Sequence, residues 1–104
     1  MIRVSVYYPN EQGKKFDFDY YVQRHMALVR ERLKDFGVTR TEVDRGVAGG
    51  APKSPAPYVA VGHVYVDSLE GFQKGMAAHG AEIMGDIPNY TDLRPQIQIS
   101  EVVG

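Results

Sequence analysis

The sequence contains no cysteine, which excludes disulfide bonds and thiolate chemistry. It also has no apolar run of membrane-spanning length and no signal-peptide pattern. Twelve basic residues against thirteen acidic ones give a formal net charge of −1, so the electropositive surface that nucleic acid requires is not expected. We therefore expect a cytoplasmic protein that binds neither membranes nor nucleic acid.

Motifs for metals and for phosphate-bearing cofactors are also missing. The three histidines show neither HxxxH nor HxH spacing, which makes a metal centre a weak hypothesis. The glycines at positions 46, 49 and 50 do not match the strand-to-helix fingerprint that binds the phosphates of flavin or nicotinamide cofactors. No pattern favours haem binding through His25 either. We expect a protein with no metal and no cofactor.

What is present is the composition of a small folded domain. The chain has 104 residues, of which 43% are hydrophobic and 24% are charged. This composition argues against disorder, and the length predicts a single domain over residues 1–104. Since so small a domain buries only part of the surface that its unfolded chain exposes, oligomerisation would be a natural source of further burial.

Hydrophobic periodicity predicts four strands. Residues 2–8 alternate between apolar and polar side chains, and residues 96–102 do the same near the end of the chain. Residues 39–47 combine β-branched side chains with charges, which indicates a polar edge strand. Residues 58–66 are apolar on both faces, as expected for a strand in the centre of a sheet. A loop rich in glycine and proline, residues 46–57, joins these last two strands.

Two helices are predicted between the strands. Asp17 and Ser68 are suitable N-cap residues, and Gly37 is a suitable end for the first helix. In this first helix, residues spaced three and four apart predict one apolar face. Its members are Phe18, Val22, Met26, Val29, Leu33 and Phe36. His25 would lie at the edge of that face.

The resulting order, βαββαβ, predicts an α+β, ferredoxin-like protomer with an antiparallel sheet and two helices on one face. The other sheet face would carry a mixture of polar and apolar side chains, among them Val59, Val61, His63 and Tyr65. Packing against a second copy explains such a half-apolar face well, and we therefore predict a homodimer through it. His63 would then lie inside the dimer, where a hydrogen bond across the interface is favoured over contact with a ligand.

Three groups of residues together form a recognisable pattern. They are Tyr8, Pro9 and Asn10 after the first strand, Phe16, Asp17, Tyr20, Tyr21, His25, Met26, Leu28 and Val29 around the first helix, and the run from Asp86 through Ile87, Pro88, Asn89 and Tyr90 to Thr91. In these residues the chain resembles the EthD family, named after a protein associated with ethyl tert-butyl ether degradation. The resemblance implies a ferredoxin-like protomer whose sheet faces that of its partner in a dimeric α+β barrel, with a pocket beneath the helices. The family often has proline two positions after its helix histidine, where this chain has Ala27, so a straighter helix is expected here.

His25 is the leading candidate for function. A histidine titrates near neutral pH, which suits a general acid or base, although a satisfied core histidine is the alternative. At 100° per residue Tyr21 falls beside His25 and could orient it, whereas Tyr20 falls near the solvent side. For Tyr21 the alternative is packing alone. Asp86 could hold His25 in one tautomer, or it could be a capping or turn residue.

Two functions from different classes fit these residues. The first is a small cofactorless enzyme of lyase, isomerase or oxygenase type that acts on a small apolar oxygenated molecule, with His25 moving a proton and Tyr21 or Asp86 assisting. The second is a non-catalytic ligand-binding or accessory protein of an oxygenase or degradation system. His25 beside Asp86 or Tyr21 at the mouth of an apolar pocket would favour the enzyme. His25 fully enclosed by core side chains, with no cavity within hydrogen-bonding reach, would exclude it.

Overall fold

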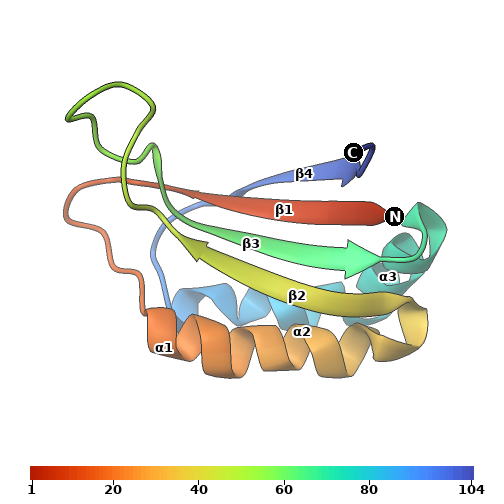
Figure 1. The fold of residues 1–104 in the computed structure, drawn as a ribbon. Helices are drawn as coiled ribbons and strands as arrows, with labels where there is room; N and C mark the ends of the chain where they lie inside the picture. The colour runs from red at the N-terminus through yellow and green to blue at the C-terminus, as the bar shows by residue number, and fades with distance from the viewer.

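Four antiparallel strands form one sheet, and the helices cover one of its faces (Figure 1). The computed structural model describes all of residues 1–104. The strands are β1 (Ile2–Pro9), β2 (Val38–Arg45), β3 (Tyr58–Val66) and β4 (Gln96–Glu101). Their spatial order is β2-β3-β1-β4, which places β3 inside the sheet and β2 at an edge, as the sequence predicts. The ferredoxin-like arrangement is therefore confirmed.

Strand pairing determines which side chains share a face of the sheet. In β1, Val4 lies opposite Val64 of β3 and Ile99 of β4, and Ser5 lies opposite His63. Successive side chains on a strand point to opposite faces. Val4 therefore points into the core beneath the helices, whereas Ser5 points to the other face and bonds there with His63.

The first helical segment covers residues 18–36 and changes its winding along the way. It consists of α1 (Phe18–Tyr20), a π-helical turn (Tyr21–His25), α2 (Met26–Leu33) and a 3-10 turn (Lys34–Phe36). Asp17 caps its start by accepting a hydrogen bond from the Tyr20 N–H. Gly37 ends it with a φ of 94°, a left-handed conformation that glycine adopts readily. Both boundaries agree with the sequence prediction.

The π-helical turn corrects the predicted apolar face. The sequence predicts a buried Val22, but Val22 is 46% exposed and Tyr21 is buried in its place. In the π-helical turn the N–H of Met26 bonds to the carbonyl of Tyr21, five residues earlier. The wider turn brings Tyr21, not Val22, onto the same face as Met26. The prediction for Val22 is wrong because it assumed 3.6 residues per turn throughout.

The second helix agrees with its prediction. α3 (Leu69–Gly85) begins after Ser68, whose hydroxyl accepts a hydrogen bond from the Gly71 N–H. A short 3-10 turn (Ile87–Asn89) then leads the chain back towards β4. No helix of the chain has the length and the hydrophobicity needed to cross a bilayer.

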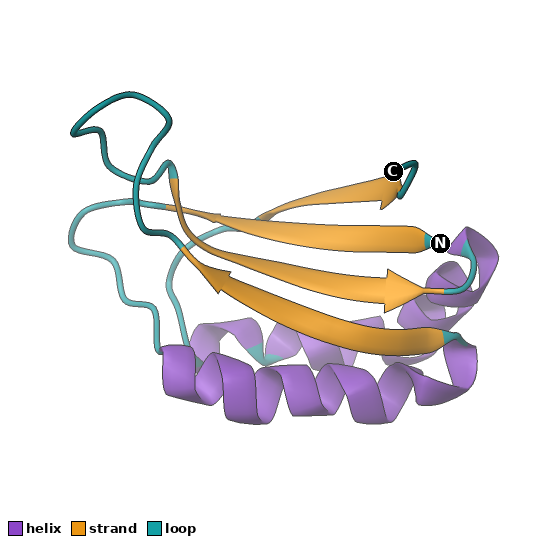
Figure 2. Cartoon of the chain, in the orientation of Figure 1, coloured by secondary structure: helices purple, strands orange, loops and turns teal.

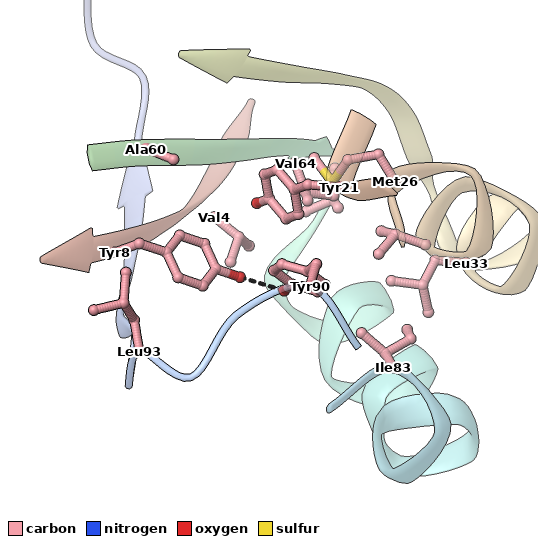
Figure 3. Close-up of a cluster of buried hydrophobic side chains, with 12 residues drawn as sticks. Val4, Tyr8, Tyr21, Met26, Leu33, Ala60, Val64, Ile83, Tyr90 and Leu93 are labelled. Carbon is pink, nitrogen blue, oxygen red and sulfur yellow. Dashed lines mark hydrogen bonds between the residues drawn. The ribbon is translucent and has the colours of Figure 1, made fainter. Parts of the chain in front are cut away.

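The core lies between the sheet and the helices. Figure 3 shows Tyr8, Tyr21 and Tyr90 among its aliphatic side chains, with a hydrogen bond between the hydroxyls of Tyr8 and Tyr90. The rings of Tyr8 and Tyr21 meet edge to face, with centroids 5.5 Å apart. Both are almost fully buried, as is Tyr90. Three tyrosines, each from a different part of the chain, thus form one end of the core.

The opposite face of the sheet has no helix over it (Figure 2). We call it the open face; it carries Arg3, Ser5, Tyr7, Val61, His63 and Tyr65 from the two inner strands. The guanidinium of Arg40 lies 4.1 Å above the ring of Tyr65, and the Tyr65 hydroxyl donates to Glu42. The predicted loop between β2 and β3 projects beyond the end of the sheet (Figure 1).

Candidate active site

His25 is the last residue of the π-helical turn and is only 5% exposed. Its Nδ1 atom lies 3.0 Å from Oδ2 of Asp86, the residue that directly follows α3. The wider turn places His25 next to Met26 on the buried side of the helix. The end of α3 then supplies a charged partner from 61 residues further along the chain.

Asp86 is surrounded by donors. Its Oδ1 atom accepts hydrogen bonds from Tyr20 Oη at 2.6 Å and from Asn89 Nδ2 at 2.9 Å, while Oδ2 faces His25. Burial raises the pKa of Asp86, but the hydrogen bonds from Tyr20, Asn89 and His25 together outweigh burial and hold that pKa below its usual value. Asp86 is therefore an ionised carboxylate at neutral pH, and an ionised carboxylate can only accept hydrogen bonds.

The carboxylate determines where His25 carries its proton. Burial lowers the pKa of His25, and the hydrogen bond and negative charge of Asp86 oppose this effect only in part. The resting imidazole is therefore neutral, with Nδ1–H donating to Asp86 and a lone pair on Nε2. No group of the chain bonds to Nε2. Nε2 is also not fully enclosed, because the only fully enclosed side-chain nitrogen or oxygen without a partner is Arg3 Nε. Nε2 is consequently open to a ligand or to water.

His25 lines an apolar cavity of about 60 Å³ between the sheet and the helices. Most of the wall is hydrophobic and comes from both helices and from three strands. It includes Val6, Leu33, Val64, Phe72, Met76 and Ile97. Met84 of α3 and Ile97 of β4 line the cavity and are also partly exposed, so the wall reaches the protein surface there and this is the candidate opening. His25 is the only residue of the wall that titrates near neutral pH.

Tyrosine rings surround the imidazole. The ring of Tyr21 stacks on His25 with centroids 5.5 Å apart and planes 18° from parallel, and the ring of Tyr90 lies 4.8 Å away. Burial raises the pKa of Tyr8, Tyr21 and Tyr90, so all three phenols stay neutral at physiological pH. Tyr8 and Tyr90 share one hydrogen bond of 2.6 Å, which leaves one O–H of the pair to donate elsewhere.

Comparison with known proteins identifies the family. A family profile described as EthD domain matches residues 11–94, a range that contains His25, Asp86 and their neighbours Tyr20, Asn89 and Tyr90. The chain belongs to the EthD family. A crystal structure of an EthD-like protein from Ralstonia eutropha JMP134 is 47% identical to it, with a TM-score of 0.93 and coverage of 99% of this chain and 92% of that chain.

Two more distant structures have a similar fold. An ethyl tert-butyl ether degradation (EthD) family protein from Bacillus halodurans C-125 is 21% identical, with a TM-score of 0.66 and coverage of 99% of both chains. A dimeric ferredoxin-like protein from an uncultured marine organism is 14% identical, with a TM-score of 0.61 and coverage of 100% of this chain and 96% of that chain. No curated protein matches the chain.

The structure of this EthD-family chain brings the three predicted site residues together. Asp86 bonds to His25, and Tyr21 stacks on the imidazole. Tyr20, which the sequence places near the solvent side, also reaches the site, because the end of α3 packs beside the start of the first helix and offers Asp86 to its hydroxyl. Asn89 was not predicted either. The only signal for Asn89 was its place in the run of residues 86–91 that carries the family resemblance.

His63 lies on the open face, on the other side of the sheet from the cavity. Its Nδ1 atom is 3.0 Å from Ser5 Oγ, and its Nε2 atom is 2.8 Å from Asp44 Oδ2. These are the residue types of a serine-hydrolase triad, but Ser5 is only 2% exposed, so an acyl substrate cannot reach its hydroxyl. The hydrogen bonds of His63 with Ser5 and Asp44 instead link β1, β3 and β2. No three histidine, aspartate or glutamate side chains converge as metal ligands anywhere in the chain.

Proposed function

We propose that this chain is an EthD-family enzyme that moves a proton on a small apolar oxygenated molecule, with His25 as the general acid and base. The observation that carries the proposal is that His25 lines an otherwise apolar cavity while Asp86 holds its Nδ1 atom. A desolvated titratable group with a charged partner in a cleft is typical of acid–base sites. A proton transfer of this kind can serve lyase, isomerase or oxygenase chemistry.

In the proposed step, Nε2 of neutral His25 takes a proton from a C–H or O–H group of the ligand. The electron pair of the broken bond stays on the ligand, as an enolate or an oxyanion. The imidazolium keeps its Nδ1–H bond to Asp86, whose negative charge stabilises it. Tyr8 lines the same cavity, and its neutral hydroxyl is the candidate donor to a ligand oxygen. Return of the proton from Nε2 to another ligand atom would complete an isomerisation.

The cavity limits the size of the ligand. Its volume of about 60 Å³ is well below the roughly 150 Å³ of an apolar cavity that binds benzene. A ligand of a few heavy atoms would fit inside, and a larger one would extend through the opening or displace Met76 and Met84. These two side chains are unbranched and adapt readily to a new neighbour.

We further propose that two copies pair through the open face to form a dimeric α+β barrel. The face carries both charge signs, with Arg3 on β1 and Arg40, Glu42 and Asp44 on β2, so a two-fold axis can bring opposite charges of two copies together. The marine protein with the same fold is dimeric, which supports the pairing of two copies.

The competing function is ligand binding without chemistry, as in a carrier or an accessory protein of an oxygenase system. One observation favours it: when Tyr8 is the donor of its bond with Tyr90, the Tyr8 hydroxyl has no proton to offer a ligand, which would then be held mainly by hydrophobic contacts. Both functions predict a ligand in the cavity. Only the enzyme predicts proton exchange on that ligand.

Acetone and cyclopentanone, two small ketones, test both functions. In deuterium oxide their α-hydrogens exchange when a base removes them, and we expect the wild-type protein to bind them and to accelerate this exchange. In His25→Gln the rate of the catalysed exchange should fall by about 10²–10⁴-fold, the usual contribution of general base catalysis. The control is His79→Gln, which alters a histidine of α3 that packs against Phe36. Binding without accelerated exchange would assign the carrier function, and the absence of both would contradict the proposal.

A further inference from the structure

Tyr20 and Asn89 touch Asp86 but do not line the cavity. They line the surface groove between the first helical segment and the end of α3, together with Asp86 itself. His25 lines the cavity on the other side. The two residues therefore cannot meet a ligand in the cavity, and any influence they have on its chemistry must pass through Asp86 and His25.

The two oxygens of Asp86 are divided between the groove and the imidazole. Oδ1 receives both the Tyr20 hydroxyl and the Asn89 amide, whereas Oδ2 is left to His25. Asn89 Nδ2 also lies 3.4 Å from Tyr20 Oη, so the two donors support each other. With Oδ1 fixed in this way, the carboxylate cannot rotate without breaking two hydrogen bonds.

We infer that Tyr20 and Asn89 are positioning residues, which hold Asp86 so that His25 carries its proton on Nδ1 and presents an unprotonated Nε2 to the cavity. This inference rests on the proposed function, because the tautomer matters for catalysis only if Nε2 meets a ligand. It does not restate that function, since neither residue touches the ligand. Without the two donors, the carboxylate is free to turn towards water in the groove, and the imidazole loses the acceptor that selects Nδ1–H.

A purely structural role is the alternative. Tyr20 and Asn89 join the start of the first helix to the segment after α3, so their loss could lower stability without any effect on the imidazole. The tautomer of His25 separates the two roles, because a structural tie would leave it unchanged. It can be read from imidazole nitrogen chemical shifts, since the nitrogen that carries the proton resonates far upfield of the one that does not.

The sharpest variant is Asp86→Asn, which keeps the shape of the side chain. Tyr20 and Asn89 both donate towards the groove, so they should retain the amide oxygen there and turn the amide NH₂ towards His25 Nδ1. His25 must then accept at Nδ1 and move its proton to Nε2. We expect Nδ1–H in the wild type, Nε2–H in Asp86→Asn, and a mixture of both tautomers in Tyr20→Phe and in Asn89→Ala.

The experiment is nitrogen-15 NMR of the full chain at a pH where the imidazole is neutral. Tyr7→Phe is the control, because Tyr7 lies on the open face, across the sheet from His25, and packs against Tyr58. A wild-type His25 with its proton on Nε2, or Tyr20→Phe and Asn89→Ala variants that keep the wild-type tautomer, would overturn the inference. Amide spectra of each variant establish that it is folded. The tautomer measurement needs no ligand, so it can succeed even if the ketone experiment fails. The ketone experiment can likewise succeed even if the tautomers do not change, so failure of the inference and failure of the proposed function are distinguishable.

Discussion

The hydroxyl of Tyr21 lies in the space that a side chain at Gly62 would need. Gly62 belongs to β3, and its Cα–H faces the first helical segment. A strand glycine often marks such a close approach by another group. Because β3 has no side chain at this point, the Tyr21 ring can lie against the sheet, and His25 stacks on that ring. The position of the imidazole thus depends on a glycine in the sheet.

Gly62→Ala should therefore displace Tyr21 and disturb the site. A new Cβ would overlap the Tyr21 hydroxyl, and overpacking of this kind usually lowers the free energy of unfolding by about 1–3 kcal/mol. Urea unfolding measures the loss, and the NMR signals of His25 should shift. Gly50→Ala is the matched control, because a Cβ at Gly50 meets no atom within 4 Å. Equal unfolding midpoints for the two variants would show that the Tyr21 ring does not depend on Gly62.

Much of the fold could be predicted because it is encoded locally. Alternation along β1 places Val4 and Ser5 on opposite faces whatever the rest of the chain does. Asp17 and Ser68 cap helices through backbone N–H groups only three residues away. These patterns, read in order, are enough to give the βαββαβ arrangement.

The site could be predicted only in part because it depends on contacts between distant segments. His25 and Tyr21 are one helical turn apart, so their proximity follows from the helix. The π-helical turn does not follow from the helical pattern, because Tyr21 is buried against Gly62, which belongs to strand β3. The bond from Tyr20 to Asp86 likewise joins residues 66 positions apart. Helical periodicity contains no information about either contact.

Asp86→Ala should lower the stability of the protein. The change leaves His25 Nδ1, the Tyr20 hydroxyl and the Asn89 amide without their shared acceptor. Removal of one partner from a partly buried network usually lowers the free energy of unfolding by about 1–3 kcal/mol. Chemical denaturation measures it. Asp35→Ala, at an exposed aspartate in the 3-10 turn, should stay within about 0.5 kcal/mol of the wild type. A similarly small effect for Asp86→Ala would mean that water replaces the carboxylate without loss of stability.

Stability should also fall as the pH is lowered through the ordinary pKa of histidine. Burial places the pKa of His25 below its usual 6.5, so the unfolded chain binds a proton at a pH where the folded chain does not. The stability that comes from this neutral histidine is complete above pH 6.5 and is lost as the pH falls towards the folded pKa. One proton contributes a slope of at most about 1.4 kcal/mol per pH unit. The lowered pKa of Asp86 adds a loss of the same sign, starting near its usual 3.8.

Urea unfolding between about pH 7.5 and pH 5.5 measures this slope. His25→Gln should have a flatter dependence than the wild type, because the group that takes up the proton on unfolding is gone. His79→Gln should keep the wild-type contribution from His25, since it leaves the imidazole and Asp86 in place. Parallel curves for the wild type and His25→Gln would show that the fold does not favour the neutral form of His25.

Val61→Lys should separate the proposed dimer into monomers. Val61 lies on the open face opposite Asp44, so a lysine there has a neighbouring carboxylate within its own chain and the protomer should still fold. In a two-fold dimer, however, the substitution places two charged lysine side chains in the apolar part of one interface, where their desolvation is costly. Light scattering coupled to size exclusion should give twice the chain mass of 11.6 kDa for the wild type and the single mass for Val61→Lys. Val22→Lys, on the exposed side of the first helix, should remain dimeric. A wild type that is monomeric at micromolar concentration would contradict the dimer. A Val61→Lys variant that is still dimeric would show that the two copies do not pair through the open face, the face of the sheet without helices over it.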